Sequence, residues 1–157
     1  MNGLLSTILT IVRARRLALE KGLQGSSITI AKTLIADWTA EGAKLATITW
    51  LRQVSARQVH LDLVCSQNDA MAVGVQKAAR AELVGWAGIP MLGCDGVPNV
   101  GQQYVKEGTL AATVIKPVTA GPAVDWIVRR IRGEKPSRHL VLRPTSFPAL
   151  QDLARRP

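Results

Sequence analysis

Four short clusters of polar and aromatic residues each follow an apolar run. They are Asp37-Trp38, Ser66 to Asp69, Cys94 to Gly96 and Lys116-Pro117. Asn68 and Asp95 are short, planar and polar, so each can engage two neighbouring hydroxyl groups. Trp38 offers a flat apolar face on which the C–H side of a ring can pack, and Lys116 adds a donor. Flat apolar surface beside bidentate polar groups is what binding of a polyol requires.

Each of these residues also has a purely structural interpretation. Asn68 and Asp69 can cap a following helix, because a short polar side chain satisfies its free amide groups. Asp95-Gly96 is also typical of a turn. Trp38 alone would more often be a core residue, and Lys116 alone a surface lysine. Their joint placement after successive apolar runs favours a binding site.

The elements that would position these residues alternate between helix and strand. Apolar spacing predicts helices over residues 4–23, 39–54 and 119–132, a helix beginning at Asn68 or Asp69, and a short helix between Pro98 and Gly108. Strands are predicted over residues 28–35, 60–65, 89–94 and 110–115, with a last strand beginning at 140–142. This alternation predicts an α/β fold with a mainly parallel sheet. Ligands of such sheets bind beyond the carboxyl ends of the strands, where the four clusters fall.

Length and composition predict one folded domain. The chain has 157 residues, of which 47% are hydrophobic and 20% charged, which is not the composition of a disordered protein. A net charge of +9 is compatible with nucleic-acid binding. No aromatic residues are interleaved with the clustered arginines, so a solvated basic face without a nucleic-acid partner is favoured. The first residues lack a basic leader and a small-residue cleavage site, so we expect a helix there rather than a signal peptide.

The remaining reactive residue types indicate neither a cofactor nor a metal. Cys65 and Cys94 lie in apolar runs and are expected to be buried thiols, and their spacing is not that of a metal site. His60 and His139 have no Cys or His neighbour at ligand spacing. No Gly-x-Ser-x-Gly elbow or phosphate-binding glycine loop is present. We therefore expect a binding protein rather than an enzyme.

Three segments, in order, resemble the type I periplasmic sugar-binding proteins of the ribose-binding group. Ser66-Gln67-Asn68-Asp69-Ala70-Met71-Ala72-Val73-Gly74 is similar to the family segment Q-N-D-x-M-A-x-G, and Gly93-Cys94-Asp95-Gly96 is similar to G-x-D-G. Residues 107–117 are similar to x-G-x-L-x-A-T-V-x-Q-P, and Asp37-Trp38-Thr39 looks like the aromatic position after the preceding strand. The resemblance reaches from residue 3 to residue 143, more weakly outside these motifs.

The resemblance implies the carboxyl-terminal lobe of a two-lobed protein, a flavodoxin-like, three-layer αβα sandwich. Residues 1–143 would form this lobe, and residues 144–157 a loosely held tail. An arginine of the first helix often joins the site in this family, and Arg13 is the best match, with Arg15 and Arg16 close to it. The implied sugar-binding residues are therefore Arg13, Trp38, Asn68, Asp95 and Lys116.

Two residues depart from the family pattern. Lys116 stands where a hydrogen-bonding glutamine is usual, which favours an anionic or phosphorylated ligand or marks a site no longer used. Cys94 stands where an aromatic residue is frequent, which removes one wall for stacking.

The family pattern also implies that parts are missing from this sequence. The first lobe has no counterpart, and neither has the sheet strand that normally precedes the first helix. The helix at 119–133 normally packs on the first lobe, so its apolar stripe would be exposed. We therefore expect weak or no sugar binding by the chain alone, and a homodimer or an exchange of elements between copies.

The implied function is that of a solute receptor for an ABC-type transporter. Its partners would be a sugar ligand and a membrane permease, and the full-length protein would be periplasmic. The alternative is the effector-binding domain of a lactose-repressor-type transcription regulator, which shares the fold and an N-D-x-M-A-x-G-like segment. The run from Glu107 to Leu110 before Ala112-Thr113-Val114 looks more like the transport group.

Overall fold

The protein is built on a four-stranded, mainly parallel sheet. The computed structural model describes residues 13–54, 56, 59–82 and 88–153. The strands lie in the order β1-β2-β3-β4, the first three parallel and the last antiparallel to β3. Their bounds are β1 Val64–Cys65, β2 Met91–Asp95, β3 Ala112–Ile115 and β4 Thr145–Phe147. The α/β class with a mainly parallel sheet is therefore confirmed.

Helices connect the parallel strands, as the apolar spacing predicts. Their bounds are α2 Ala40–Leu51, α3 Asp69–Glu82, α4 Gly101–Lys106, α5 Ala120–Ile131 and α6 Leu150–Leu153. Residues 13–22 are also helical, and the earlier part of the predicted first helix lies outside the described residues.

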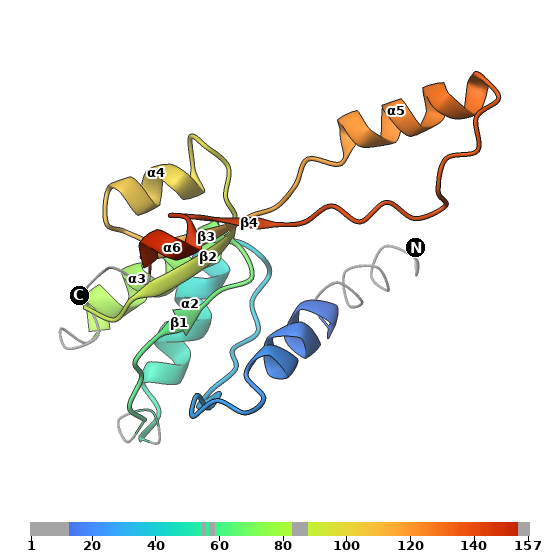
Figure 1. Cartoon of the computed structure of the whole chain (residues 1–157). Coiled ribbons are helices and arrows are strands. Elements are labelled where there is room, and N and C mark those ends of the chain that lie inside the picture. Colours follow the sequence, from blue (N-terminus) through green and yellow to red (C-terminus); the bar gives the residue numbers. More distant parts are fainter. Residues whose placement is uncertain (1–12, 55, 57–58, 83–87, 154–157) are drawn as a thin grey trace, which may run out of the picture.

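The core lies where α3 packs between α2 and the sheet (Figure 1). Close contact of the two helices depends on Gly74, because a Cβ there would overlap the carbonyl oxygen of Ala40. On its other side α3 contacts β2, and α4 packs on β2 and β3. The buried centre consists of Ala72, Met91, Val105 and Leu110. This packing fixes the start of α3 beside the carboxyl ends of the strands.

The strand predicted over residues 28–35 is wrong. The segment is extended but unpaired, and Ile28 and Ile35 are 59% and 90% exposed. Residue types favour a strand here, but backbone hydrogen bonds form only if a neighbouring strand supplies the partner groups. The outer edge of β1 pairs with none of the described residues, so the sheet ends there and 28–35 forms an open connection to α2 (Figure 1).

The last strand begins later than predicted. Leu140 and Val141 are exposed, whereas β4 lies in the segment expected to be a loose tail. Phe147 pairs with Thr113 of β3 and packs against the buried centre. An aromatic side chain that reaches the core gives this segment enough buried surface to join the sheet edge.

A projecting arm consists of α5 and the chain that returns from it (Figure 1). No residue of α5 is buried, and Val124, Ile127 and Ile131 are each more than half exposed, which confirms the expected exposed stripe. Trp126 Nε1 donates to the Ser137 carbonyl oxygen at 2.7 Å and holds the returning chain to the helix. Throughout the described residues, every helix is too short or too polar to cross a membrane.

Candidate ligand-binding site at the strand ends

The turn before α2 fixes the position of Trp38. Thr39 caps the helix, since its Oγ1 accepts from Gly42 N at 2.9 Å. Asp37 Oδ1 in turn accepts from Thr39 N at 3.1 Å and from Thr39 Oγ1 at 2.6 Å. The bond from the hydroxyl is the main reason that the pKa of Asp37 lies below its ordinary value. Trp38, between the two, takes a φ of 70°.

Asn68 joins the start of α3 to this turn. Its Nδ2 donates to the Trp38 carbonyl oxygen at 2.9 Å, and its Oδ1 accepts from Met71 N at 2.7 Å. The capping interpretation is therefore correct. A side-chain amide has two donor hydrogens and two acceptor lone pairs, so one of each is left for a ligand. Capping and ligand binding are compatible at this residue.

Asp69 is the most deeply placed acid of the region, with 3% of its surface exposed. Its Oδ2 accepts from Gly96 N at 2.9 Å and its Oδ1 from Thr113 Oγ1 at 2.5 Å. Burial raises its pKa, and the two hydrogen bonds oppose that effect. Asp69 thus fastens α3 to the ends of β2 and β3. Sequence reasoning treated it as a helix cap; its place beside Asn68 in the motif was the only signal of this wider role.

Asp95 and Lys116 lie together at the ends of β2 and β3. Lys116 Nζ is 3.4 Å from Asp95 Oδ1, and the two side chains are 60% and 35% exposed. Gly96, which follows, has a φ of 62°, and a Cβ there would collide with the backbone of Ile115. Only glycine allows the turn to pass so close to β3, which brings Asp95 beside Lys116.

Backbone strain coincides with two of the predicted site residues. Among the described non-glycine residues, Trp38 and Asp95 are the two with positive φ, at 70° and 109°. Such conformations cost about 1–3 kcal/mol each and concentrate at ligand and catalytic sites.

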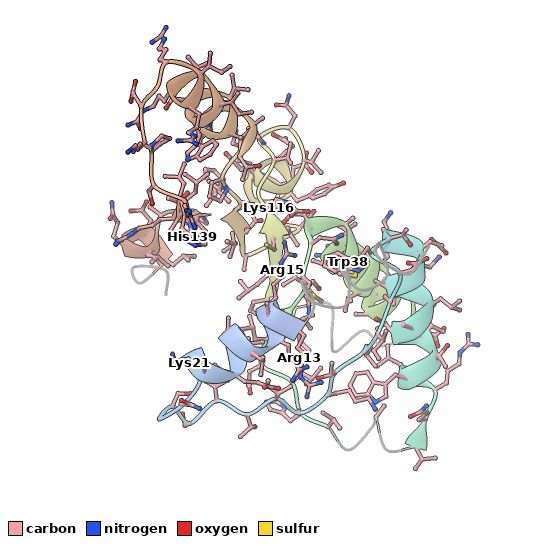
Figure 2. All side chains as sticks on the ribbon, turned by 90° about the vertical axis from the view of Figure 1, so that its right-hand side faces the viewer. Arg13, Arg15, Lys21, Trp38, Lys116 and His139 are labelled. Atoms are coloured by element: carbon pink, nitrogen blue, oxygen red, sulfur yellow. The ribbon has the colours of Figure 1, made fainter. Side chains whose placement is uncertain are left out.

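The structure brings Arg15, rather than Arg13, to these residues. Arg15 Nη1 donates to the Gln67 carbonyl oxygen at 2.6 Å, and its guanidinium carbon lies 5.5 Å from the centre of the Trp38 ring (Figure 2). Arg13 is exposed, and no hydrogen bond or ion pair joins it to Trp38 or the other described site residues. One face of the indole is thus covered by Arg15. That contact is worth about 0.5–1 kcal/mol at an exposed site, so a ligand can displace it.

The two cysteines differ from their expected burial. Cys65 is exposed and Cys94 is half-buried. Cys65 lies at the sheet edge, which no described strand covers. Burial raises the pKa of the Cys94 thiol, and the nearby charge of Arg15 opposes that effect. We define the strand-end rim as Arg15, Trp38, Asn68, Asp95 and Lys116. No group of three or more potential metal ligands occurs in the described parts of the chain.

The chain belongs to the periplasmic binding protein domain family, whose sequence profile matches residues 10–135. Over 105 residues it is 31% identical to the D-galactose/methyl-galactoside binding periplasmic protein MglB of Haemophilus influenzae. That alignment covers 66% of this chain and 29% of the relative.

Solved structures show the same fold. The Caulobacter myo-inositol binding protein matches with a TM-score of 0.69 and 24% identity, over 87% of this chain and 46% of that one. The binding protein of the arabinose ABC transporter from Shewanella sp. ANA-3 matches with a TM-score of 0.62 and 26% identity, over 80% and 41%. The chain therefore spans less than half the length of these relatives.

Proposed function

We propose that this chain is the carboxyl-terminal lobe of a ribose-like sugar receptor and that its strand-end rim binds a sugar or related polyol. The supporting observation is the convergence of Asn68 on Trp38 and of Lys116 on Asp95 beyond the ends of parallel strands. Of the arginines in the first helix, Arg15 replaces Arg13 in the proposal because it contacts the indole.

The relatives support this ligand class. Their names give galactose or methyl-galactoside, myo-inositol and arabinofuranose, all of them hydroxylated rings. We propose by extension that the full-length protein is periplasmic and delivers its ligand to the permease of an ABC transporter, without catalysing a reaction.

We propose that the chain alone binds weakly. The rim is open, with the Lys116 side chain 60% exposed, so water competes for its polar groups. A second lobe closing over the rim would exclude that water and add contacts, and without it the affinity is expected to be about millimolar.

The test is a titration of the ¹⁵N-labelled chain followed by NMR. D-galactose, myo-inositol and L-arabinose should shift the indole N–H of Trp38 and the side-chain amide of Asn68, while the indole of Trp126 on the arm stays in place. Dioxane, a ring without hydroxyl groups, serves as the control, and Trp38→Phe assigns the indole signal. No change at Trp38 up to about 100 mM of each sugar, which is a hundredfold excess over a millimolar Kd, refutes the proposal.

We also propose that the isolated chain associates with itself. Two features favour contact with a second copy: the exposed stripe of α5, with Ile131 80% exposed, and the edge of β1, which pairs with none of the described residues. Sedimentation velocity should show a mass that rises with concentration and falls in Ile131→Glu. A monomer at every concentration would contradict self-association.

A further inference from the structure

We infer that the strand-end rim takes a hydroxylated ring that carries an acidic group, either a carboxylate or a phosphate. This rests on the proposed sugar-binding function and adds the charge class of the ligand. The observations behind it are the cations of the rim and the partners that they have or lack.

Lys116 is available to an anion. Its ammonium has three donor hydrogens, and the one described partner is Asp95 at 3.4 Å. With 60% of the lysine side chain exposed, this pair is worth at most about 1 kcal/mol, because water and salt screen it. Lys116 can therefore share its charge between Asp95 and a ligand at little cost.

Arg15 carries a charge that no described carboxylate neutralises. One terminal nitrogen donates to a backbone carbonyl, and the remaining N–H groups have no acceptor in the described part of the chain. In Figure 2, Arg15 lies near both Lys116 and Trp38, while Arg13 lies on the other side of the same helix. A guanidinium with free N–H groups matches the paired oxygens of carboxylates and phosphates.

Two acids near the rim accept hydrogen bonds from neutral groups of the chain. Asp37 accepts from Thr39, and Asp69 is buried with both oxygens bonded. Asp95 is the acid of the strand-end rim, and Lys116 lies against it. The exposed carboxylate of Asp37 lies next to Trp38 and keeps its charge, but no hydrogen bond or ion pair joins it to either rim cation. Among the described residues Lys116 pairs only weakly with Asp95 and Arg15 has no carboxylate partner, so a ligand acid can pair with both cations.

An acidic group would also prepare the stacking surface. The guanidinium of Arg15 covers one face of the Trp38 ring in the absence of ligand. An anion that draws Arg15 toward itself uncovers the indole, and the sugar ring can then pack on it. A neutral sugar provides no comparable attraction, so it competes with Arg15 for the same face.

The experiment compares matched ligands at constant ionic strength, with the NMR signals of Trp38 and Asn68 as readout. The ligands are D-galactose, D-galacturonate, D-galactose 6-phosphate and inorganic phosphate. We expect at least one of the two acidic sugars to bind about three- to tenfold more tightly than galactose, the gain expected for one or two exposed ion pairs. The comparison between them identifies carboxylate or phosphate as the group recognised.

Substitutions test whether the preference for acidic sugars comes from the rim cations or from the overall positive charge of the chain. Lys116→Gln and Arg15→Gln should each reduce the preference for the acidic sugar, whereas Lys135→Gln on the arm should leave it unchanged. Added salt should weaken the binding of the acidic sugar and leave the binding of galactose unchanged. Both rim side chains are at least partly exposed, and amide dispersion in the spectra confirms that each variant is folded.

The outcomes distinguish the two proposals. Galactose binding as tightly as both acidic sugars overturns the acidic-ligand inference and leaves the sugar-binding function intact. An unchanged preference in Lys116→Gln and Arg15→Gln overturns it as well, as does inorganic phosphate matching the acidic sugars. If no sugar shifts Trp38, the proposed function fails and this inference fails with it.

Discussion

Replacing Asp69 with alanine should destabilise the protein more than any exposed acidic substitution. The side chain is 3% exposed and connects the start of α3 with Gly96 after β2 and Thr113 in β3. Removing it leaves a buried N–H and a buried O–H without acceptors. Thr113 is itself 1% exposed, so water cannot replace the lost partner there.

The magnitude follows from two opposing effects. Two hydrogen bonds to an ionised acceptor are worth together about 3–6 kcal/mol. Burial raises the pKa of Asp69, so its charged form carries a desolvation penalty that alanine relieves. We therefore expect a net loss of about 2–4 kcal/mol in the free energy of unfolding.

Urea unfolding followed by circular dichroism measures this loss. With an m-value of about 2 kcal/mol/M, the midpoint should fall by about 1–2 M. Asp62→Ala is the matched control, because this acid is 88% exposed, and it should change stability by less than about 0.5 kcal/mol. Thr113→Val keeps the shape and removes one donor, so it remains measurable if Asp69→Ala does not fold. If Asp69→Ala and Asp62→Ala shift the midpoint equally, the connecting role is refuted.

Three further predictions follow from local geometry. Gly74→Ala should cost about 1–3 kcal/mol in urea unfolding, because its Cβ overlaps the backbone of α2. Gly121→Ala on the exposed helix α5 has no such overlap and should cost less than about 1 kcal/mol, the amount set by the Pro122 that follows it. Equal losses in the two variants would contradict the close contact between α2 and α3. Because burial raises the pKa of Asp69, the folded state binds that proton more tightly than the unfolded state, so this residue's contribution to stability falls as pH rises from about 4 through the raised pKa. Urea midpoints measured between about pH 4 and 7 should show this pH dependence, and Asp69→Asn should remove it. A pH dependence that is unchanged in Asp69→Asn would belong to other titratable groups. Asp95→Gly should stabilise the fold by about 0.5–1 kcal/mol by relieving its positive φ, while abolishing the sugar-induced shift at Trp38; a loss of stability would show that φ is not strained.

The fold was predictable where a segment carries its own periodic pattern. The stripe that ends at Ile131 and the cap at Asn68 are local features, and both helices form near the predicted residues. Residues 28–35 have an equally clear strand composition, yet no strand forms. A strand needs a partner, and composition alone does not provide one. The predictions at 28–35 and at the start of β4 were therefore wrong for the same reason. Residue preference was judged from the sequence, whereas strand pairing decides which residues join the sheet.

The candidate site was predictable as far as the parallel-sheet rule reaches. Asn68, Asp95 and Lys116 follow β1, β2 and β3, where the rule places them. Trp38 follows no strand, and it reaches the site through its contact with Asn68. The choice among neighbouring arginines was not predictable, because successive helix residues point in different directions by about 100° each. A two-residue error in aligning the helix therefore exchanges Arg13 for Arg15, and the contact with Trp38 distinguishes the two in the folded chain.

The positive φ values at Trp38 and Asp95 indicate whether these two residues stabilise the fold or serve ligand binding. Glycine would adopt either conformation at no steric cost, and the neighbouring Gly96 shows that this turn accepts it. A tryptophan with φ of 70° and an aspartate with φ of 109° therefore reduce stability relative to glycine. Neither side chain compensates by filling the core, since both are only partly buried. A cost of this kind is typical of residues kept for binding, and it therefore supports the proposed contact of Trp38 and Asp95 with a hydroxylated ring.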